Sequence, residues 1–119
     1  MARHNDLGKL GEQLAIDYLV EKGYAILNQN YRFDKAEIDI IAKKQEILAI
    51  IEVKTRRNAE FGKPQSFVQS QQIKRIVKAA HEFVIENNLN VDIRFDIIAI
   101  LKTDKSLQID HIENAFYHF

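Results

Sequence analysis

The sequence predicts an α/β fold with a mixed sheet. Apolar residues recur at helical spacing in two stretches, residues 6–22 and residues 66–88. Runs rich in Ile and Val lie between these stretches and after them, and such runs favour strands. Helical and strand patterns thus alternate along 119 residues, a length that fits one domain over residues 1–119.

The composition excludes several classes of protein. Hydrophobic residues at 46% and charged residues at 29% are ordinary for a globular domain. The chain has no cysteine, which excludes disulfides and thiolate metal ligands. No apolar run reaches membrane length and no signal-peptide core is present, so we expect a cytoplasmic protein without a membrane partner. The formal net charge of zero argues against bulk-charge binding to nucleic acid but allows a local basic patch.

The first helix is predicted over residues 6–22, with Gly23 as its left-handed stop. Gly8, Gly11 and Glu12 share one face of it. Each internal glycine costs about 1 kcal/mol relative to alanine, so we expect another backbone to approach this face closely. Taken alone, the helix pattern favours Glu12 as a surface residue.

Five strands are predicted, and the second and third form a β-hairpin. The polar residues 32–35 predict a loop before that hairpin, and the last strand is expected at an edge of the sheet. The strands span residues 24–31, 38–42, 47–53, 91–101 and 107–112.

The hairpin carries charges on a shared face. Glu52 and Lys54 are two residues apart on one strand, so they point to the same side. With the turn at residues 44–45, Asp39 lies opposite Ile50 and diagonal to Glu52, within about 7–8 Å. A register shift that keeps the faces matched would place Asp39 directly opposite Glu52.

This charge set has a chemical use. Two facing carboxylates repel each other unless a cation lies between them, and Mg²⁺ or Mn²⁺ bound by oxygen ligands is the usual solution. Asp39 and Glu52 with Lys54 form the set that metal-assisted phosphodiester hydrolysis needs, because the metal activates water and the ammonium orients it or stabilises developing charge. The alternative is an edge-strand charge pair. Residues 47–51 are apolar on both faces, which favours a central strand whose charged end opens into a cleft.

Several motifs resemble those of known families. Asp39 followed by Glu52-Val53-Lys54 resembles the D…(D/E)xK motif of the PD-(D/E)xK nuclease superfamily. The series G-x-x-G-E, N-Y-R, E-I-D-I-I-A, E-V-K-T-R, F-G and R-F-D-I-I-A, between residues 8 and 99, resembles the YraN family of small bacterial endonuclease-like proteins. That family is similar in fold to archaeal Holliday-junction resolvases. The resemblance implies a restriction-endonuclease-like fold, an αβββαβ core with a mixed sheet flanked by helices.

The resemblance also implies roles for individual residues. Asp39, Glu52 and the Val53 carbonyl would bind Mg²⁺ or Mn²⁺, and Lys54 would position the nucleophilic water or stabilise the transition state. Glu12 would orient Lys54 or complete the metal shell. The expected function is a metal-dependent nuclease acting on DNA, with branched or flapped DNA among the expected substrates. The alternatives are a non-catalytic nucleic-acid-binding accessory that keeps the fold and a purely structural partner protein.

Candidate DNA-binding residues lie in two places. Arg56 and Arg57 continue the basic run after the hairpin, where a phosphate backbone would lie. Lys74 and Lys78 share a face of the second helix, and Gln72 stands where the family tends to have lysine. The alternative for the helix residues is a solvated surface.

Two features leave alternatives open. Ala36 stands where the family usually has glycine, so this residue is strained or the loop differs if that glycine needs a positive φ. The aromatic tail, residues 113–119, could pack on the core or on a second subunit, which leaves a homodimer open.

Overall fold

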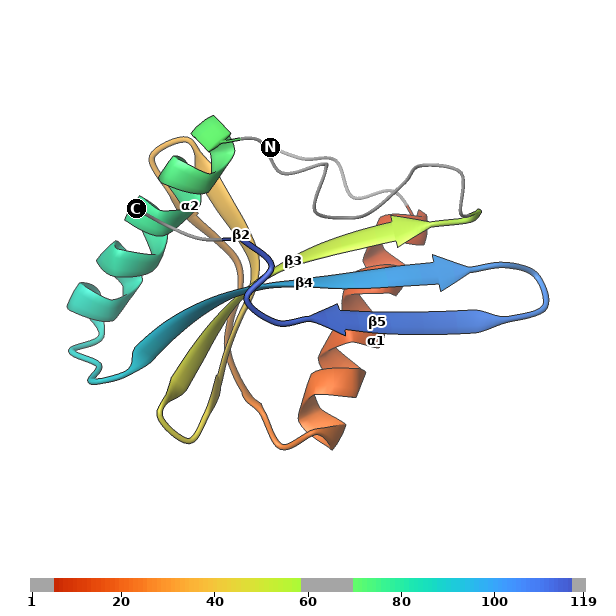
Figure 1. Cartoon of the computed structure of the whole chain (residues 1–119), viewed down its shortest axis with the longest axis horizontal. Helices are drawn as coiled ribbons and strands as arrows, with labels where there is room; N and C mark the ends of the chain where they lie inside the picture. Colours follow the sequence, from red (N-terminus) through yellow and green to blue (C-terminus); the bar gives the residue numbers. More distant parts are fainter. Residues whose placement is uncertain (1–5, 59–69, 117–119) are drawn as a thin grey trace.

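A computed structural model describes residues 6–58 and 70–116, which form a five-stranded sheet and two helices (Figure 1). This arrangement confirms the predicted α/β class and the αβββαβ order, to which a fifth strand is added. In chain order the elements are α1 (Asp6–Glu21), β1 (Ala25–Phe33), β2 (Ala36–Lys44), β3 (Ile47–Arg56), α2 (Ser70–Glu86), β4 (Asp92–Lys102) and β5 (Leu107–Ile112).

The strands lie in the sheet in their chain order, β1-β2-β3-β4-β5. Among the described strands, only β3 and β4 pair in parallel, and the connection between them contains α2. The other neighbours pair antiparallel, so the sheet is mixed, as predicted. The strand with the charged end, β3, is therefore the middle one, and β5 is an edge strand as expected.

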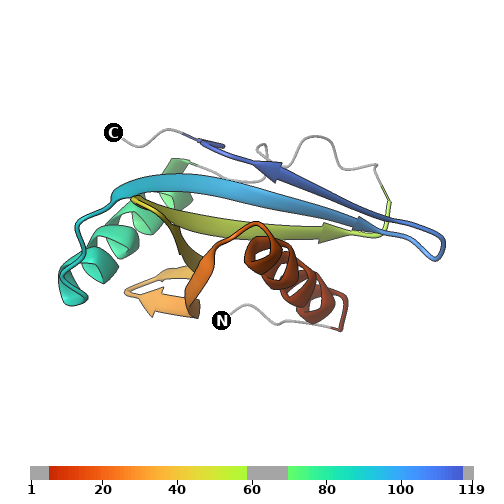
Figure 2. The ribbon, with the colours of Figure 1, turned by 90° about the horizontal axis from the view of Figure 1, so that it is seen from below.

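The two faces of the sheet carry separate apolar clusters. Leu48 and Ile50 of β3 pack in one cluster with Ile76 of α2. Ala49 and Ile51 pack in the other with Leu19 of α1. Because successive side chains of a strand point to opposite faces, α1 and α2 cover opposite sides of the sheet. Figure 2 shows the molecule turned, with α1 below β3 and β4. Each fully buried Leu or Ile contributes about 1.5–3 kcal/mol to this layering.

The predicted loop at residues 32–35 is shorter in the structure, which corrects that prediction. Strand β1 continues through Phe33, which pairs with Ala36 of β2, so only Asp34 and Lys35 form the turn. Asp34 has a φ of 57°, whereas Ala36 is not among the residues with positive φ and is buried. The strain considered for Ala36 is therefore absent, because the left-handed position falls on Asp34 instead.

The register of the β2–β3 hairpin also differs from the first of the two predicted. Lys44 pairs with Ile47, so the turn is at Gln45 and Glu46. Gln45 takes the left-handed conformation, with a φ of 54°. Ile50 lies opposite Ile41 rather than Asp39. The prediction of Asp39 opposite Ile50 is wrong by two residues, and the face-preserving shift is the register that forms.

Helix ends agree with the sequence where the structure describes them. Gly23 follows α1 with a φ of 95°, as expected for a left-handed stop. The predicted start of the second helix at Ser66 lies outside the described residues. Phe116 packs on the α2-side core, with its ring centroid 5.4 Å from that of Phe95. None of the helices in residues 6–58 and 70–116 is long and apolar enough to cross a membrane.

Candidate functional site

The candidate site lies where β2 and β3 separate. Their paired register ends at Ile40 and Ile51, while β3 stays paired with β4 as far as Arg56. Figure 1 shows β2 turning away from β3 at this level. At the separation, the Val53 backbone N–H donates to Asp39 Oδ2 over 2.8 Å. The Asp39 side chain thus satisfies a β3 amide next to the point where the two strands diverge.

The side chains of Asp39 and Glu52 lie next to each other and interact electrostatically. Burial, together with the adjacent Asp39 charge, raises the pKa of Glu52 to about 8. Burial also raises the pKa of Asp39, although the Val53 amide opposes that shift. The two carboxyl groups titrate as a unit, and the pair retains a proton at neutral pH because both charges together would be poorly solvated.

Two further side chains contact the carboxylate pair. Lys54 Nζ lies 3.8 Å from Glu52 Oε2, and these side chains are only 21% and 13% exposed. Gln72 of α2 donates through Nε2 to the same Glu52 oxygen over 3.2 Å. The structure therefore brings together Asp39, Glu52 and Lys54, which the sequence placed on one face, and adds an amide from a helix 20 residues away in the sequence.

A cleft of about 420 Å³ opens beside the pair. One wall is the β1–β2 turn and the start of β2, and the other is the first part of α2. Its lining contains three acids, Glu37, Asp39 and Glu52, the amides Gln71 and Gln72, and two cations, Lys35 and Arg75. We call this the acid cleft. Ala36 and Ile76, both buried in the α2-side core, line it where the two walls meet.

The acid pair suits a hard divalent cation. All its donor atoms are carboxylate oxygens, and their raised pKa values show that the pair lacks sufficient compensating positive charge. Among the described residues, no group of three His, Cys, Asp or Glu is placed to hold a metal. A cation here would therefore have two carboxylates, with a backbone carbonyl and water completing its shell, as Mg²⁺ commonly does.

Glu12 lies on α1, on the opposite side of the sheet from the α2-facing side chains. It is half-buried and follows Gly11, which packs against the Thr55 side chain. Gly11 precedes Glu12 in the chain and Thr55 follows Lys54, so the contact between Gly11 and Thr55 brings the backbones next to Glu12 and Lys54 together. Its assigned role of orienting Lys54 or completing a metal shell stays a prediction.

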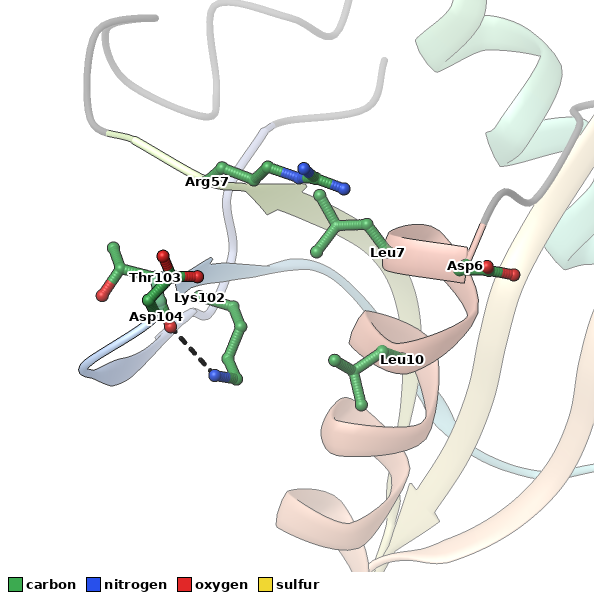
Figure 3. Close-up of a pocket in the computed structure, with 7 residues that line it drawn as sticks. All are labelled: Asp6, Leu7, Leu10, Arg57, Lys102, Thr103 and Asp104. Atoms are coloured by element: carbon green, nitrogen blue, oxygen red, sulfur yellow. Dashed lines mark hydrogen bonds between the residues drawn. The ribbon is translucent and has the colours of Figure 1, made fainter.

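Arg56, the last residue of β3, and Arg57, which follows it, lie away from the acid cleft. Arg57 lines a different pocket of about 610 Å³, formed with the start of α1 and the end of β4. Figure 3 shows its side chain reaching toward Leu7, with Lys102 on the facing side. Arg56 donates to the Thr55 carbonyl over 2.9 Å. Neither arginine lines the acid cleft.

The α2 lysines also lie apart from the acids. Lys74 and Lys78 line a small, mainly apolar depression with Ile73 and Val77. Arg75, which the sequence analysis left out of the DNA-binding set, is the α2 cation that lines the acid cleft. Residues 75, 72 and 71 share the helix face that includes buried Ile76, which is the signal that could have found it.

A second polar cluster is buried on the α1 side of the sheet. Asp96 is fully buried and accepts hydrogen bonds from Arg94 and from the Asn114 amide. His111 Nε2 lies 2.8 Å from Asp96 Oδ2, and His111 Nδ1 lies 3.1 Å from the Tyr18 hydroxyl. These partners lower the pKa of Asp96 despite its burial. Arg94, Asp96, His111 and Tyr18 each have a partner within the cluster, so the cluster joins β4, β5 and α1 structurally.

Comparisons with known proteins agree with the motif series. The chain is 57% identical to a UPF0102 protein of Flavobacterium psychrophilum and 54% identical to one of Christiangramia forsetii, each over the full 119 residues of both chains. It is 45% identical to a UPF0102 protein of Bacteroides thetaiotaomicron, over 98% of this chain and 97% of the relative. Residues 11–100 match the family described as "Uncharacterised protein family UPF0102". The chain belongs to the UPF0102 family, the YraN family that its motifs predict.

Proposed function

We propose that this protein is a metal-dependent nuclease that hydrolyses phosphodiester bonds in DNA. The observation that carries the proposal is the partly buried pair Asp39–Glu52 with Lys54 Nζ 3.8 Å from Glu52, beside an open cleft. Two carboxylates and an ammonium at the end of a central strand also match the motif of the PD-(D/E)xK superfamily.

Each side chain has a stated task. Asp39, Glu52 and the Val53 carbonyl hold Mg²⁺ or Mn²⁺, which supplies positive charge and Lewis acidity to the site when bound. Lys54 positions the attacking water or stabilises the negative charge that grows on the phosphate. Gln72 fixes the orientation of the Glu52 carboxylate through its 3.2 Å hydrogen bond.

Cleavage assays test this assignment. Purified protein is incubated with Mn²⁺ or Mg²⁺ and a panel of linear, flapped and branched DNAs, beside the variants Lys54→Ala and Glu52→Gln. We expect Lys54→Ala to slow cleavage about a hundredfold, because losing transition-state stabilisation of about 3 kcal/mol has that effect. DNA binding by the same variant should fall only by the contribution of one phosphate contact.

Matched controls come from exposed residues of the same type. Lys105 lies in the β4–β5 turn and Glu46 in the β2–β3 turn. The variants Lys105→Ala and Glu46→Gln should both cleave at the native rate. Cleavage that survives in Lys54→Ala at the native rate would indicate a contaminating nuclease and would remove the assignment.

A non-catalytic DNA-binding accessory is the second candidate. The observation in its favour is Gln72, which contacts Glu52 with an uncharged amide where the family tends to have lysine. This candidate predicts DNA binding without metal-dependent cleavage on every substrate of the panel. Under it, Glu52→Gln would strengthen binding, because the variant removes a negative charge from the cleft.

A further inference from the structure

Two cationic side chains at the acid cleft have no role in the proposed metal binding or catalysis. Lys35 and Arg75 both line the cleft, and both are exposed. Within residues 6–58 and 70–116, neither side chain makes an ion pair or a hydrogen bond. Three acids, Glu37, Asp39 and Glu52, line the same cleft, yet the two cations remain outside ion-pair distance of them.

The two cations come from opposite walls. Lys35 is the second residue of the two-residue β1–β2 turn, and Arg75 lies in the second turn of α2. The walls meet at the buried residues Ala36 and Ile76, so packing of the core fixes the relative position of the two backbones. Each cation therefore lies next to a core residue in the chain, Lys35 before Ala36 and Arg75 before Ile76.

We propose that Lys35 and Arg75 form a two-sided clamp that binds the phosphodiester backbone of a nucleic-acid strand at the acid cleft. The clamp deepens the proposed function, since it rests on nucleic acid as the ligand of this cleft but does not require cleavage. Phosphate is the chemistry that fits, because a guanidinium can bind it through two parallel hydrogen bonds while an ammonium adds a point charge. The clamp also offsets the repulsion that the cleft acids exert on a polyanion.

Binding measured by fluorescence anisotropy tests the clamp. A labelled oligonucleotide is titrated at several salt concentrations, with Ca²⁺ in place of Mg²⁺ so that binding is read apart from cleavage. The proteins are the native chain, Lys35→Ala, Arg75→Ala and the double variant. We expect each single change to weaken binding several-fold and to reduce the slope of log affinity against log salt by about 0.7–0.9. Arg75→Lys should restore part of the loss, because it returns the charge without the two-bond geometry.

The controls separate the clamp from general surface charge. Lys74→Ala removes the same charge from the adjacent α2 position, outside the acid cleft. Lys105→Ala removes it from the β4–β5 turn, at the far end of the molecule from α2 (Figure 1). Lys105→Ala should bind like the native chain, and Lys74→Ala, which changes a residue that the sequence predicts to contact DNA, should lose less affinity than Arg75→Ala. Equal losses in Lys74→Ala and Arg75→Ala would overturn the clamp and favour a diffuse basic helix face.

The clamp and the nuclease assignment can fail separately. Selective loss in the two cleft variants, without cleavage by the native protein, supports the clamp and removes the nuclease. Cleavage by the native protein, with the cleft variants binding like Lys105→Ala, removes the clamp alone. Thermal melts of the variants should match the native midpoint, because neither side chain has a partner within the described residues.

Discussion

The carboxyl groups of Asp39 and Glu52 lower the stability of the folded protein when both are ionised. Burial raises both pKa values, and a neighbouring charge adds to each shift: that of Asp39 raises the pKa of Glu52, and that of Glu37 raises the pKa of Asp39. For Glu52 the pKa rises from an ordinary value of 4.5 to about 8. Between these two values the folded protein holds more protons than the unfolded chain, so stability falls as pH rises.

We therefore predict that the metal-free protein loses stability from about pH 5 to pH 8. Glu52→Gln should flatten this decline and should be more stable than the native chain at pH 8, because it removes the buried charge. Denaturant unfolding at a series of pH values measures both curves. The difference between the native and variant curves is the relevant quantity, because it cancels the titration of every group that the two proteins share.

Glu46→Gln provides the matched control, since Glu46 is exposed in the β2–β3 turn. Its pH profile should follow that of the native protein. If the native profile were flat between pH 5 and pH 8, the acid pair would be better compensated than its burial indicates.

The pKa of Asp96 shifts in the opposite direction from those of Asp39 and Glu52. Its pKa is lowered by His111 and Arg94, so its contribution to stability is present above its ordinary value of 3.8 and is lost as pH falls below that. Arg94 and Asp96 are two residues apart on β4 and therefore share a face, but their spacing does not indicate their other partners. His111 comes from another strand and Tyr18 from α1, and contacts between distant segments leave no spacing in the sequence.

At the scale of elements, one glycine determines how closely α1 packs on the sheet. A Cβ on Gly11 would overlap the Thr55 hydroxyl and would lie 2.9 Å from the Thr55 Cβ. The sequence predicted a close approach at this glycine, and the structure supplies it through a side chain of β3 rather than a backbone. Strand β3 therefore packs closely on α1 at Thr55, the residue after Lys54.

We predict that Gly11→Ala destabilises the protein. Alanine favours the helix over glycine by about 1 kcal/mol, but the overlap forces α1 away from β3 and costs more than this gain. Thermal and denaturant unfolding measure the net effect. The double variant Gly11→Ala with Thr55→Ala should recover part of the loss, because it removes the nearest contact. A Gly11→Ala protein more stable than the native chain would mean that α1 can shift at little cost.

Most elements, and the face shared by the site residues, were predictable from the sequence. Period and composition gave both helices and all five strands, since apolar alternation depends on local pattern. The hairpin register was not fixed, because polar residues 43–46 allow more than one turn. The placement of Arg75 rather than Lys74 at the cleft depends on how α2 rotates on the sheet, and core packing of Ile76 decides that.

At the scale of the whole molecule, the acid pair exists only in the folded chain. Asp39 and Glu52 are brought together by the β2–β3 register, and the layers on both faces hold that register in place. The unfolded chain offers no such pair. A cation that binds the pair therefore binds the native state selectively and stabilises it by mass action.

Our last prediction is that Mn²⁺ or Mg²⁺ raises the melting temperature of the native protein. A cation at a hundred times its dissociation constant would add about 2.7 kcal/mol. The shift should be larger at pH 8 than at pH 6, because binding must displace the proton that the pair retains. Asp39→Asn should lose the shift and be slightly more stable without metal, since repulsion is relieved. Sodium chloride at matched ionic strength controls for screening. An equal shift in Asp39→Asn would locate the cation elsewhere, and no shift in the native chain would favour the non-catalytic accessory.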